Sequence, residues 1–364
     1  MSSPEASLLS AAAFLGHAGV VKRLLENGND PTHNDTIFPS AIEAAALSGK
    51  IEILQLLQMS LPDNVEPTYN DTGSRTRPFL CHYSLGEIYQ KGKADIQGVF
   101  GAAMNGDTGI LEMAIYPPSR ADQGAAYFDY MPNGDDSLPK QWRPKVLLGK
   151  VAGFAKNWAV YTRLVSLIPE LSDHVRAMHL RRFAEYGNFD VVKNLLDAGY
   201  YVDGDVKVTE GSVGNSNVAT PLYLAARFGN ENVVNLLLEY GADVHKARLQ
   251  IHRPIEGAVK SGSIAIVRKL LSYGAVCDFT IVVQALLSEY TAMVELLLDQ
   301  FTEECLHAAF GADLAEEMSE RGLSSMLDLL YNRECFRYSD GTIVPYSPIM
   351  EDGPECPKCG ELHK

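Results

Sequence analysis

The residues best suited to chemistry lie at the C-terminus, where the chain ends in GPECPKCGELHK. Cys356 and Cys359 are separated by two residues, a spacing that directs two thiolates at one tetrahedral ion, and glycine permits the turn around it. Zinc needs four ligands, and Cys335 and His363 would complete a Cys3His set. We therefore predict a zinc knuckle and, as cofactor, one structural zinc. Two alternatives remain: a flexible tail with two thiols that bind no metal, and a redox C-x-x-C, which no thioredoxin-like strand and helix precede.

Elsewhere the sequence carries no catalytic signature. It contains no glycine-rich phosphate loop, no G-x-S-x-G elbow, no H-E-x-x-H and no kinase motif set. Cys81 and His82 are adjacent in a predicted loop, which rarely supplies the oriented base and oxyanion donors that a nucleophile needs. His179 and His307 fall on predicted helices, where hydrogen-bonded structural histidines are far commoner than catalytic ones. We expect a protein that is not an enzyme.

These residues belong to a chain that is dominated by an internal repeat. Pro221 and Pro254 are 33 residues apart (254 − 221), as are Gly229 and Gly262. In each unit a second glycine follows twelve residues later, and apolar residues lie four, five, eight and nine residues after the first. The glycines suit helix ends, and the apolar spacing gives one buried stripe on a helix. A fixed period of this length predicts stacked helix pairs.

The same frame extends over most of the chain. It locates about nine helix pairs, with Lys156 and Glu289 in the place of the first glycine in two of them; the anchors are Gly16, Gly49, Gly106, Lys156, Gly187, Gly229, Gly262, Glu289 and Gly322. Three anchor spacings are longer than 33. The two longest, of 57 and 50 residues (106 − 49 and 156 − 106), predict loop insertions at about residues 61–93 and 116–145, and the third predicts a shorter insertion at Asp203 to Val218. We predict an all-α repeat array over residues 1–330 and a separate tail over residues 331–364.

Composition narrows the classes of partner. The formal net charge is −15, and no basic tract offsets it, which argues against direct binding to nucleic acid. No apolar run reaches the ~20 residues of a membrane span, so we expect no membrane partner. Six cysteines in 364 residues are too sparse for a disulfide framework. We therefore expect an intracellular location, cytoplasmic or nuclear.

One unit carries a recognisable signature. Thr220, Pro221, Leu222, Tyr223, Ala225 and Ala226 resemble the T-P-L-H-x-A-A motif of ankyrin repeats. The match is degenerate, because Tyr223 replaces the family histidine and Glu43 and Glu256 replace it in other units. The resemblance covers roughly Ser7 to Leu330. It implies a two-layer helical solenoid whose turns project from one edge and form a concave groove.

The resemblance also implies where a partner would bind. In ankyrin arrays the two residues before the first glycine of a unit point into the groove. They include Tyr186, Arg227, Phe228 and Lys260, and with Tyr223 these are the candidate contact residues. Large aromatic residues and Arg often anchor interfaces. The alternative is that Tyr186 and Phe228 only cover the neighbouring helix.

We therefore expect a scaffold or adaptor that binds a protein through the groove and the loops. One alternative is an ankyrin-repeat transcription coregulator that acts through protein contacts. The other is an enzyme whose site lies in the two insertions. The sequence does not identify the partner.

Overall fold

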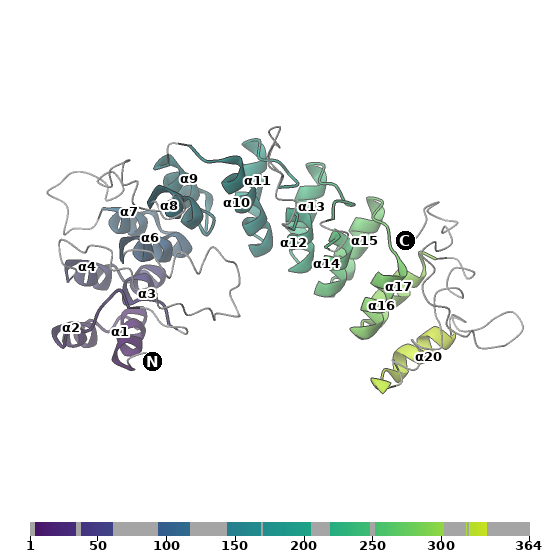
Figure 1. The fold of residues 1–364 in the computed structure, drawn as a ribbon, viewed down its shortest axis with the longest axis horizontal. Helices are drawn as coiled ribbons and strands as arrows, with labels where there is room; N and C mark the ends of the chain where they lie inside the picture. Colours follow the sequence, from purple (N-terminus) through teal and green to yellow (C-terminus); the bar gives the residue numbers. More distant parts are fainter. Residues whose placement is uncertain are drawn as a thin grey trace, which may run out of the picture. The chain divides into compact units, whose positions relative to one another are not determined.

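A computed structural model describes residues 4–33, 38–60, 94–116, 144–168, 170–204, 219–247, 252–301, 318 and 320–332. Helices are the regular secondary structure throughout these ranges, and no strand occurs in them, as the sequence predicts (Figure 1). The chain divides into two compact units, Met1–Phe183 and Ala184–Lys364. Each is treated separately below.

The first unit consists of paired helices in two layers. Its inner layer holds α1 (Pro4–Leu15), α3 (Ala41–Ser48), α6 (Ala94–Asn105) and α8 (Pro144–Ala152), and each packs on the next. The outer layer holds α2 (Ala18–Glu26), α4 (Ile51–Met59), α7 (Thr108–Ile115) and α9 (Trp158–Ser166). The unit also contains most of α10 (Asp173–Tyr186).

The second unit repeats this arrangement. After the end of α10, its inner helices are α12 (Pro221–Arg227), α14 (Pro254–Ser261) and α16 (Phe279–Leu287), packed in that order. Its outer helices are α11 (Phe189–Asp197), α13 (Glu231–Glu239), α15 (Ile264–Ser272) and α17 (Thr291–Leu298). The described residues thus contain eight of the nine expected pairs. Of the ninth pair, near Gly322, they contain α20 (Ser324–Asn332).

The turn between the two helices of a pair depends on a left-handed residue. The glycine anchors, from Gly16 to Gly322, have positive φ, as expected for a residue without a Cβ. Glu289 follows the same rule with φ 59°, so it adopts the conformation of the glycine that it replaces. Lys156 keeps its place in the register, since Val160, Tyr161 and Leu164 of α9 are buried as expected, but it does not adopt the left-handed conformation. Because α8 ends four residues earlier, at Ala152, the Lys156 N–H instead donates to Ala103 O at 2.9 Å.

Glycine also permits close approach between neighbouring inner helices. A Cβ on Gly101 of α6 would lie 2.4 Å from Glu43 O of α3. A Cβ on Gly257 of α14 would lie 2.8 Å from Tyr223 O of α12. Both glycines stand five residues before the anchor of their unit. At these two points the backbones of neighbouring inner helices are therefore in direct contact. Any residue larger than glycine would force the two helices apart.

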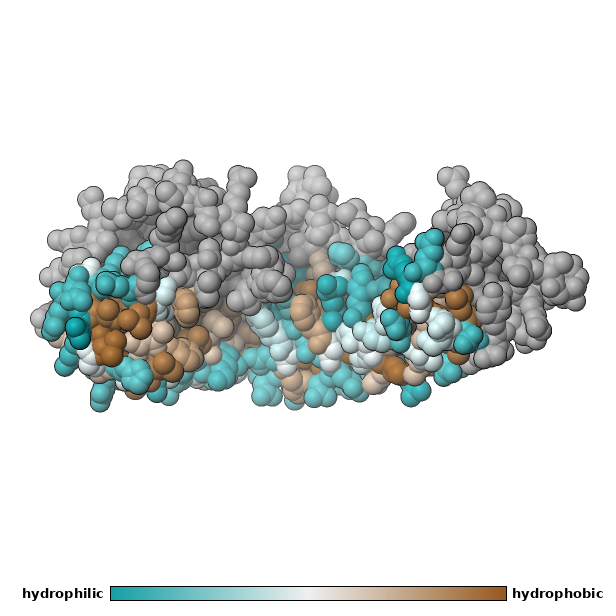
Figure 2. Space-filling model, turned by 90° about the horizontal axis from the view of Figure 1, so that it is seen from below, coloured by the Kyte–Doolittle hydropathy of each residue, from teal (hydrophilic) through white to brown (hydrophobic). Residues whose placement is uncertain are grey.

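The predicted apolar stripe of the outer helices forms the core. Val191, Val192, Leu195 and Leu196 of α11 are buried, and so are their counterparts in α13. The first helix pair differs at Val20, which is 42% exposed although it lies four residues after its anchor, as Val191 and Val233 do. Figure 2 shows a brown patch of apolar residues over the N-terminal helices.

The expected insertions lie largely outside the described residues, since 61–93 and 117–143 are not among them. The same holds for residues 333–364 of the expected tail. None of the helices in the described ranges has the length and apolar character needed to cross a lipid bilayer.

Candidate functional site: the exposed ends of the inner helices

The candidate contact residues follow from how α12 begins and ends. The Thr220 hydroxyl caps its N-terminus by accepting the Tyr223 N–H at 3.1 Å, and Pro221 takes the first helical position, where its missing N–H costs nothing. The helix closes at Arg227 and Phe228, before the left-handed Gly229. The two side chains that precede this glycine are both exposed.

Neighbouring inner helices are also held together near their C-terminal ends. Asn230, directly after Gly229, donates through Nδ2 to Ala184 O at 2.9 Å and to Glu185 O at 2.7 Å, both in the last turn of α10. On the other side of α12, Gly257 lets α14 approach closely. A Cβ added to Gly257 would lie 3.1 Å from the backbone nitrogen of Arg227. The ends of α10, α12 and α14 are therefore adjacent.

Four of the predicted contact residues lie at these ends. Tyr186 is 51% exposed and Phe228 is 53% exposed, and Arg227 and Lys260 are exposed beside them. We call these four residues the inner-helix surface. Neither Arg227 nor Lys260 forms an ion pair with another described residue, whereas Lys246 pairs with Asp203. The inner-helix surface thus combines two exposed aromatic rings with two cations whose charge is not neutralised within the described chain.

The fifth predicted contact residue, Tyr223, is not part of this surface. Its side chain is only 3% exposed and stacks on the His252 ring, with ring centroids 4.9 Å apart and planes at 20°. Tyr223 is therefore a core residue, which corrects its assignment as a partner contact. Tyr223 is buried because it lies in the first turn of α12, on the side of the helix that faces α14.

An ion-pair network fixes the turn that leads into α14. Arg253 Nε lies 2.9 Å from Glu256 Oε1, and its Nη2 lies 2.7 Å from Asp278 Oδ2. Glu256, which stands in the place of the family histidine, also accepts the His252 N–H at 3.0 Å. Burial lowers the pKa of Arg253, but the hydrogen bond to Glu256 and the charge of Asp278 outweigh it and hold that pKa above its usual value. This network orients α14 and with it Lys260.

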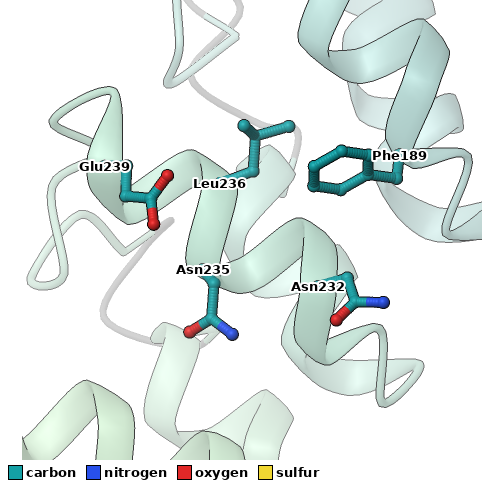
Figure 3. A pocket seen from close by; sticks show the side chains of 5 residues that line it. All are labelled: Phe189, Asn232, Asn235, Leu236 and Glu239. Carbon is teal, nitrogen blue, oxygen red and sulfur yellow. The ribbon is translucent and has the colours of Figure 1, made fainter.

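A shallow hollow of about 260 Å³ lies between the outer helices α11 and α13. Figure 3 shows the Phe189 ring pointing toward Leu236, with Asn232, Asn235 and Glu239 along α13. The sequence analysis did not single out these residues, because the hollow depends on how two outer helices pack. One carboxylate and two amides supply no paired nucleophile and base, so this lining carries no catalytic arrangement.

The histidine predicted to be structural is buried among hydrogen-bond partners. His179 Nε2 lies 2.6 Å from Gly149 O, and its Nδ1 lies 3.0 Å from the Tyr161 hydroxyl. Burial lowers the pKa of His179 to about 4, the Gly149 carbonyl opposes that shift, and the Arg182 charge adds to it. His179 is therefore a neutral core residue. His307, Cys81 and His82 lie outside the described residues.

The predicted zinc ligands Cys335, Cys356, Cys359 and His363 also lie outside the described residues. Within the described ranges, no cluster of three or more His, Cys, Asp or Glu side chains could hold a metal ion. Cys277 is a buried cysteine, 7% exposed.

Comparisons with known proteins match parts of this chain. Residues 159–248 match the family model of ankyrin repeats (3 copies). The inactive serine/threonine-protein kinase TEX14 of Bos taurus is 34% identical over 95 residues, which make up 26% of this chain and 6% of that protein. The match thus spans a small part of that relative. The human ASB11 ankyrin repeat domain has a TM-score of 0.42 and 18% identity, covering 76% of this chain and 100% of that domain. The match over residues 159–248 shows that this chain contains ankyrin repeats, and the helix pairs on either side of this range have the same order of helices and left-handed glycine anchors.

Proposed function

We propose that this chain is a scaffold or adaptor that binds a protein partner through the inner-helix surface formed by Tyr186, Arg227, Phe228 and Lys260. Ankyrin repeats are in general protein–protein interaction modules, and stacked repeats present extended surfaces suited to this role. The observation that carries the proposal is the exposure of two aromatic rings beside two cations that form no ion pair with described residues.

The chemistry of these side chains favours binding over solvation. Phe228 and Tyr186 each expose about half of their residue surface to water, and covering apolar surface is favourable by ~25 cal/mol for each Å². Aromatic residues lose little conformational entropy for the contact area they supply. Together with Arg, they supply much of the binding energy of many interfaces. Carboxylates of a partner would neutralise Arg227 and Lys260. Recognition of this kind breaks no bond, so an adaptor needs no catalytic residue.

The two alternatives differ in what they require. A transcription coregulator would use the same surface to hold a DNA-binding protein, and it would have to enter the nucleus. The net charge of −15 supports contact through protein rather than through DNA. An enzyme would need its site in the insertions, residues 61–93 and 116–145, most of which lie outside the described residues. Capture of a DNA-binding protein, or loss of a turnover after deletion of an insertion, would support the respective alternative.

A zinc knuckle at Cys335, Cys356, Cys359 and His363 remains part of the proposal, on the spacing of its thiols alone. Such a site would stabilise the tail, because zinc binding supplies folding free energy to short segments. We also propose an intracellular location, because six cysteines in 364 residues are too sparse for a disulfide framework.

Affinity capture tests the proposed function. The wild type is compared with a variant that carries Arg227→Ala and Phe228→Ala, and with a control that carries Asn232→Ala and Glu239→Ala on the outer helix α13. We expect the first variant to lose specific partners that the control retains. Recovery of the same partners at the same strength by all three proteins would contradict the proposal.

A further inference from the structure

The inner-helix surface is ordered along the repeats of the second unit. Directly before their anchors, the three successive inner-helix ends carry Tyr186, Phe228 and Ser261. One residue earlier, the same ends carry Glu185, Arg227 and Lys260. Equivalent residues of stacked repeats lie in rows across neighbouring helices. We call the first set the aromatic row and the second set the charged row.

Both rows change character at the next inner helix, α16. The equivalent residues there are Leu287, which is half-buried, and Ser288, which is exposed. The Ser288 hydroxyl donates to Gln284 O of its own helix at 2.9 Å. Neither residue carries a ring or a charge, so the rows extend from Tyr186 to Lys260 over three helix ends and two spacings between helices.

The helices that carry the rows are closely packed. Asn230 joins the unit of α12 to the last turn of α10 by hydrogen bonds to two backbone carbonyls. Gly257 allows contact between the backbones of α14 and α12, because its Cβ would lie 2.8 Å from Tyr223 O. Axes of packed helices lie ~8–10 Å apart, so each step along a row has about this length.

A partner segment that contacts every helix end must repeat its side chains at the same spacing. A polyproline II helix has three residues per turn and rises ~3.1 Å per residue, so every third side chain lies on one face, ~9.3 Å apart. The side chains on one face of a β-strand repeat every ~6.6 Å. Those of an α-helix repeat every ~5.4 Å, or ~10.8 Å over two turns. Polyproline II alone repeats within ~8–10 Å.

The charged row determines which side chains the segment carries. Arg227 and Lys260 are exposed and form no ion pair with any residue that the structure describes, so carboxylates at successive contacts would pair with them. Glu185 carries the opposite charge and would repel a carboxylate placed beside Tyr186. The segment must therefore be acidic at the α14 end of the rows and apolar at the α10 end.

We propose that the inner-helix surface binds an acidic, proline-containing segment of a protein partner in the polyproline II conformation. This inference rests on the proposed function of the surface and adds the chemistry of the partner. One face of the segment places two apolar side chains, three residues apart, on Tyr186 and Phe228. The adjacent face places two carboxylates, three residues apart, on Arg227 and Lys260. The third face is directed to solvent and accepts proline, which preorganises the segment.

The net charge of −15 does not prevent binding of an acidic segment. That charge is spread over a chain of 364 residues. At physiological ionic strength, exposed charges more than ~8 Å apart are largely screened from each other. A carboxylate that touches Arg227 or Lys260 lies within this distance, so the two cations outweigh the more distant acidic residues.

Selection from a displayed library of random twelve-residue peptides tests this inference on the full chain. The wild type is the bait, and peptides that also bind the variant with Arg227→Ala and Phe228→Ala are discarded. Circular dichroism checks that this variant remains folded. We expect the retained peptides to carry apolar residues and carboxylates at three-residue intervals, with proline between them. Retained peptides that are basic, or whose common residues repeat every two or every seven positions, would overturn the inference.

A charge exchange tests the position of the carboxylates. Lys260→Glu should weaken the binding of a retained peptide, measured by fluorescence polarisation, about fivefold or more. Exchanging the outermost acidic residue of that peptide for lysine should restore its binding to this variant. Lys193→Glu, at an exposed residue of the outer helix α11, makes the same change in net charge and should bind like the wild type. Equal losses in both variants would overturn the inference.

Affinity capture separates failure of this inference from failure of the proposed function. If the wild type captures partners through the inner-helix surface but retains no peptides of the expected pattern, the proposed function stands and the inference is wrong. If the variant with Arg227→Ala and Phe228→Ala captures the same partners as the wild type, the proposed function fails, and the inference fails with it.

Discussion

The Tyr161 hydroxyl donates a hydrogen bond to His179 Nδ1 at 3.0 Å, deep in the first unit. The opposite ring nitrogen, Nε2, lies 2.6 Å from Gly149 O, and a carbonyl can only accept. The two contacts together assign His179 the neutral form with its proton on Nε2. The histidine thereby links three helices, α8, α9 and α10, and its protonation would break the contact to Tyr161.

This arrangement predicts that the first unit loses stability in mild acid. The pKa of His179 is lowered to about 4 in the folded chain, mainly by burial, against ~6.5 for an exposed histidine. Between these two values the unfolded chain binds the proton and the folded chain does not. The contribution of the neutral ring is therefore complete above pH ~6.5 and is lost progressively as the pH falls toward 4, by up to ~3 kcal/mol. Urea denaturation monitored across this pH range measures the loss.

His179→Gln is the matched control for this pH dependence. Glutamine keeps a donor and an acceptor but does not titrate. We expect this variant to be less stable than the wild type at pH 7, and to show a smaller drop in the urea midpoint between pH 7 and pH 4. An equal drop in both proteins would show that other groups cause the acid sensitivity.

Glu289→Gly should stabilise the second unit. Glu289 holds φ at 59°, a conformation that costs an L-residue with a side chain ~1 kcal/mol and glycine almost nothing. We expect the variant to unfold at a higher urea concentration, by the equivalent of about 1 kcal/mol. Lys156→Gly is the comparison, because Lys156 is not left-handed and should gain nothing. Equal effects at the two positions would contradict this explanation.

Gly101→Ala should separate α3 from α6. Its Cβ would lie 2.4 Å from Glu43 O, and a backbone oxygen cannot move aside as a side chain can. We expect a loss of ~1–3 kcal/mol in the free energy of unfolding, the usual cost of overpacking a core. Gly19→Ala, on α2, meets no atom within 4 Å and has no left-handed φ, so it should be neutral or slightly stabilising. Chemical denaturation of both variants provides the measurement.

The zinc proposal predicts a defined stoichiometry. Native mass spectrometry of the purified chain should show one zinc per chain, lost when Cys356 and Cys359 are both changed to Ser. Changing Cys277, a buried cysteine that is not among the predicted ligands, to Ser should leave the zinc in place. A wild-type chain without zinc after purification in the presence of zinc would rule out the knuckle.

Local patterns predicted the elements of this fold well, because each helix pair carries its own signals. The glycine spacing located the left-handed turns, and Glu289 kept that conformation without the glycine. Lys156 departed from the rule because its N–H bonds to Ala103 in another pair, a long-range contact that spacing does not reveal. Val20 follows the buried pattern and is nevertheless exposed, since burial depends on a neighbour and not on the sequence of the helix alone.

The candidate site was predictable in part. The exposed positions before each glycine follow from the repeat register, which places Tyr186, Arg227, Phe228 and Lys260 at the helix ends. Tyr223, which replaces the family histidine, was assigned to the same site, but its stacking on His252 buries it. That contact joins two turns 29 residues apart (252 − 223), and residue type gives no information about it.

Site-specific photocrosslinking tests the central claim most directly. A photoreactive amino acid replaces Phe228 in one variant and Asn232, on the outer helix α13, in another. We predict that a protein partner is crosslinked in cells through position 228 and not through position 232, and that adding Arg227→Ala reduces the crosslink at 228. Crosslinks of equal yield at both positions, or at position 232 alone, would contradict a binding role for the inner-helix surface.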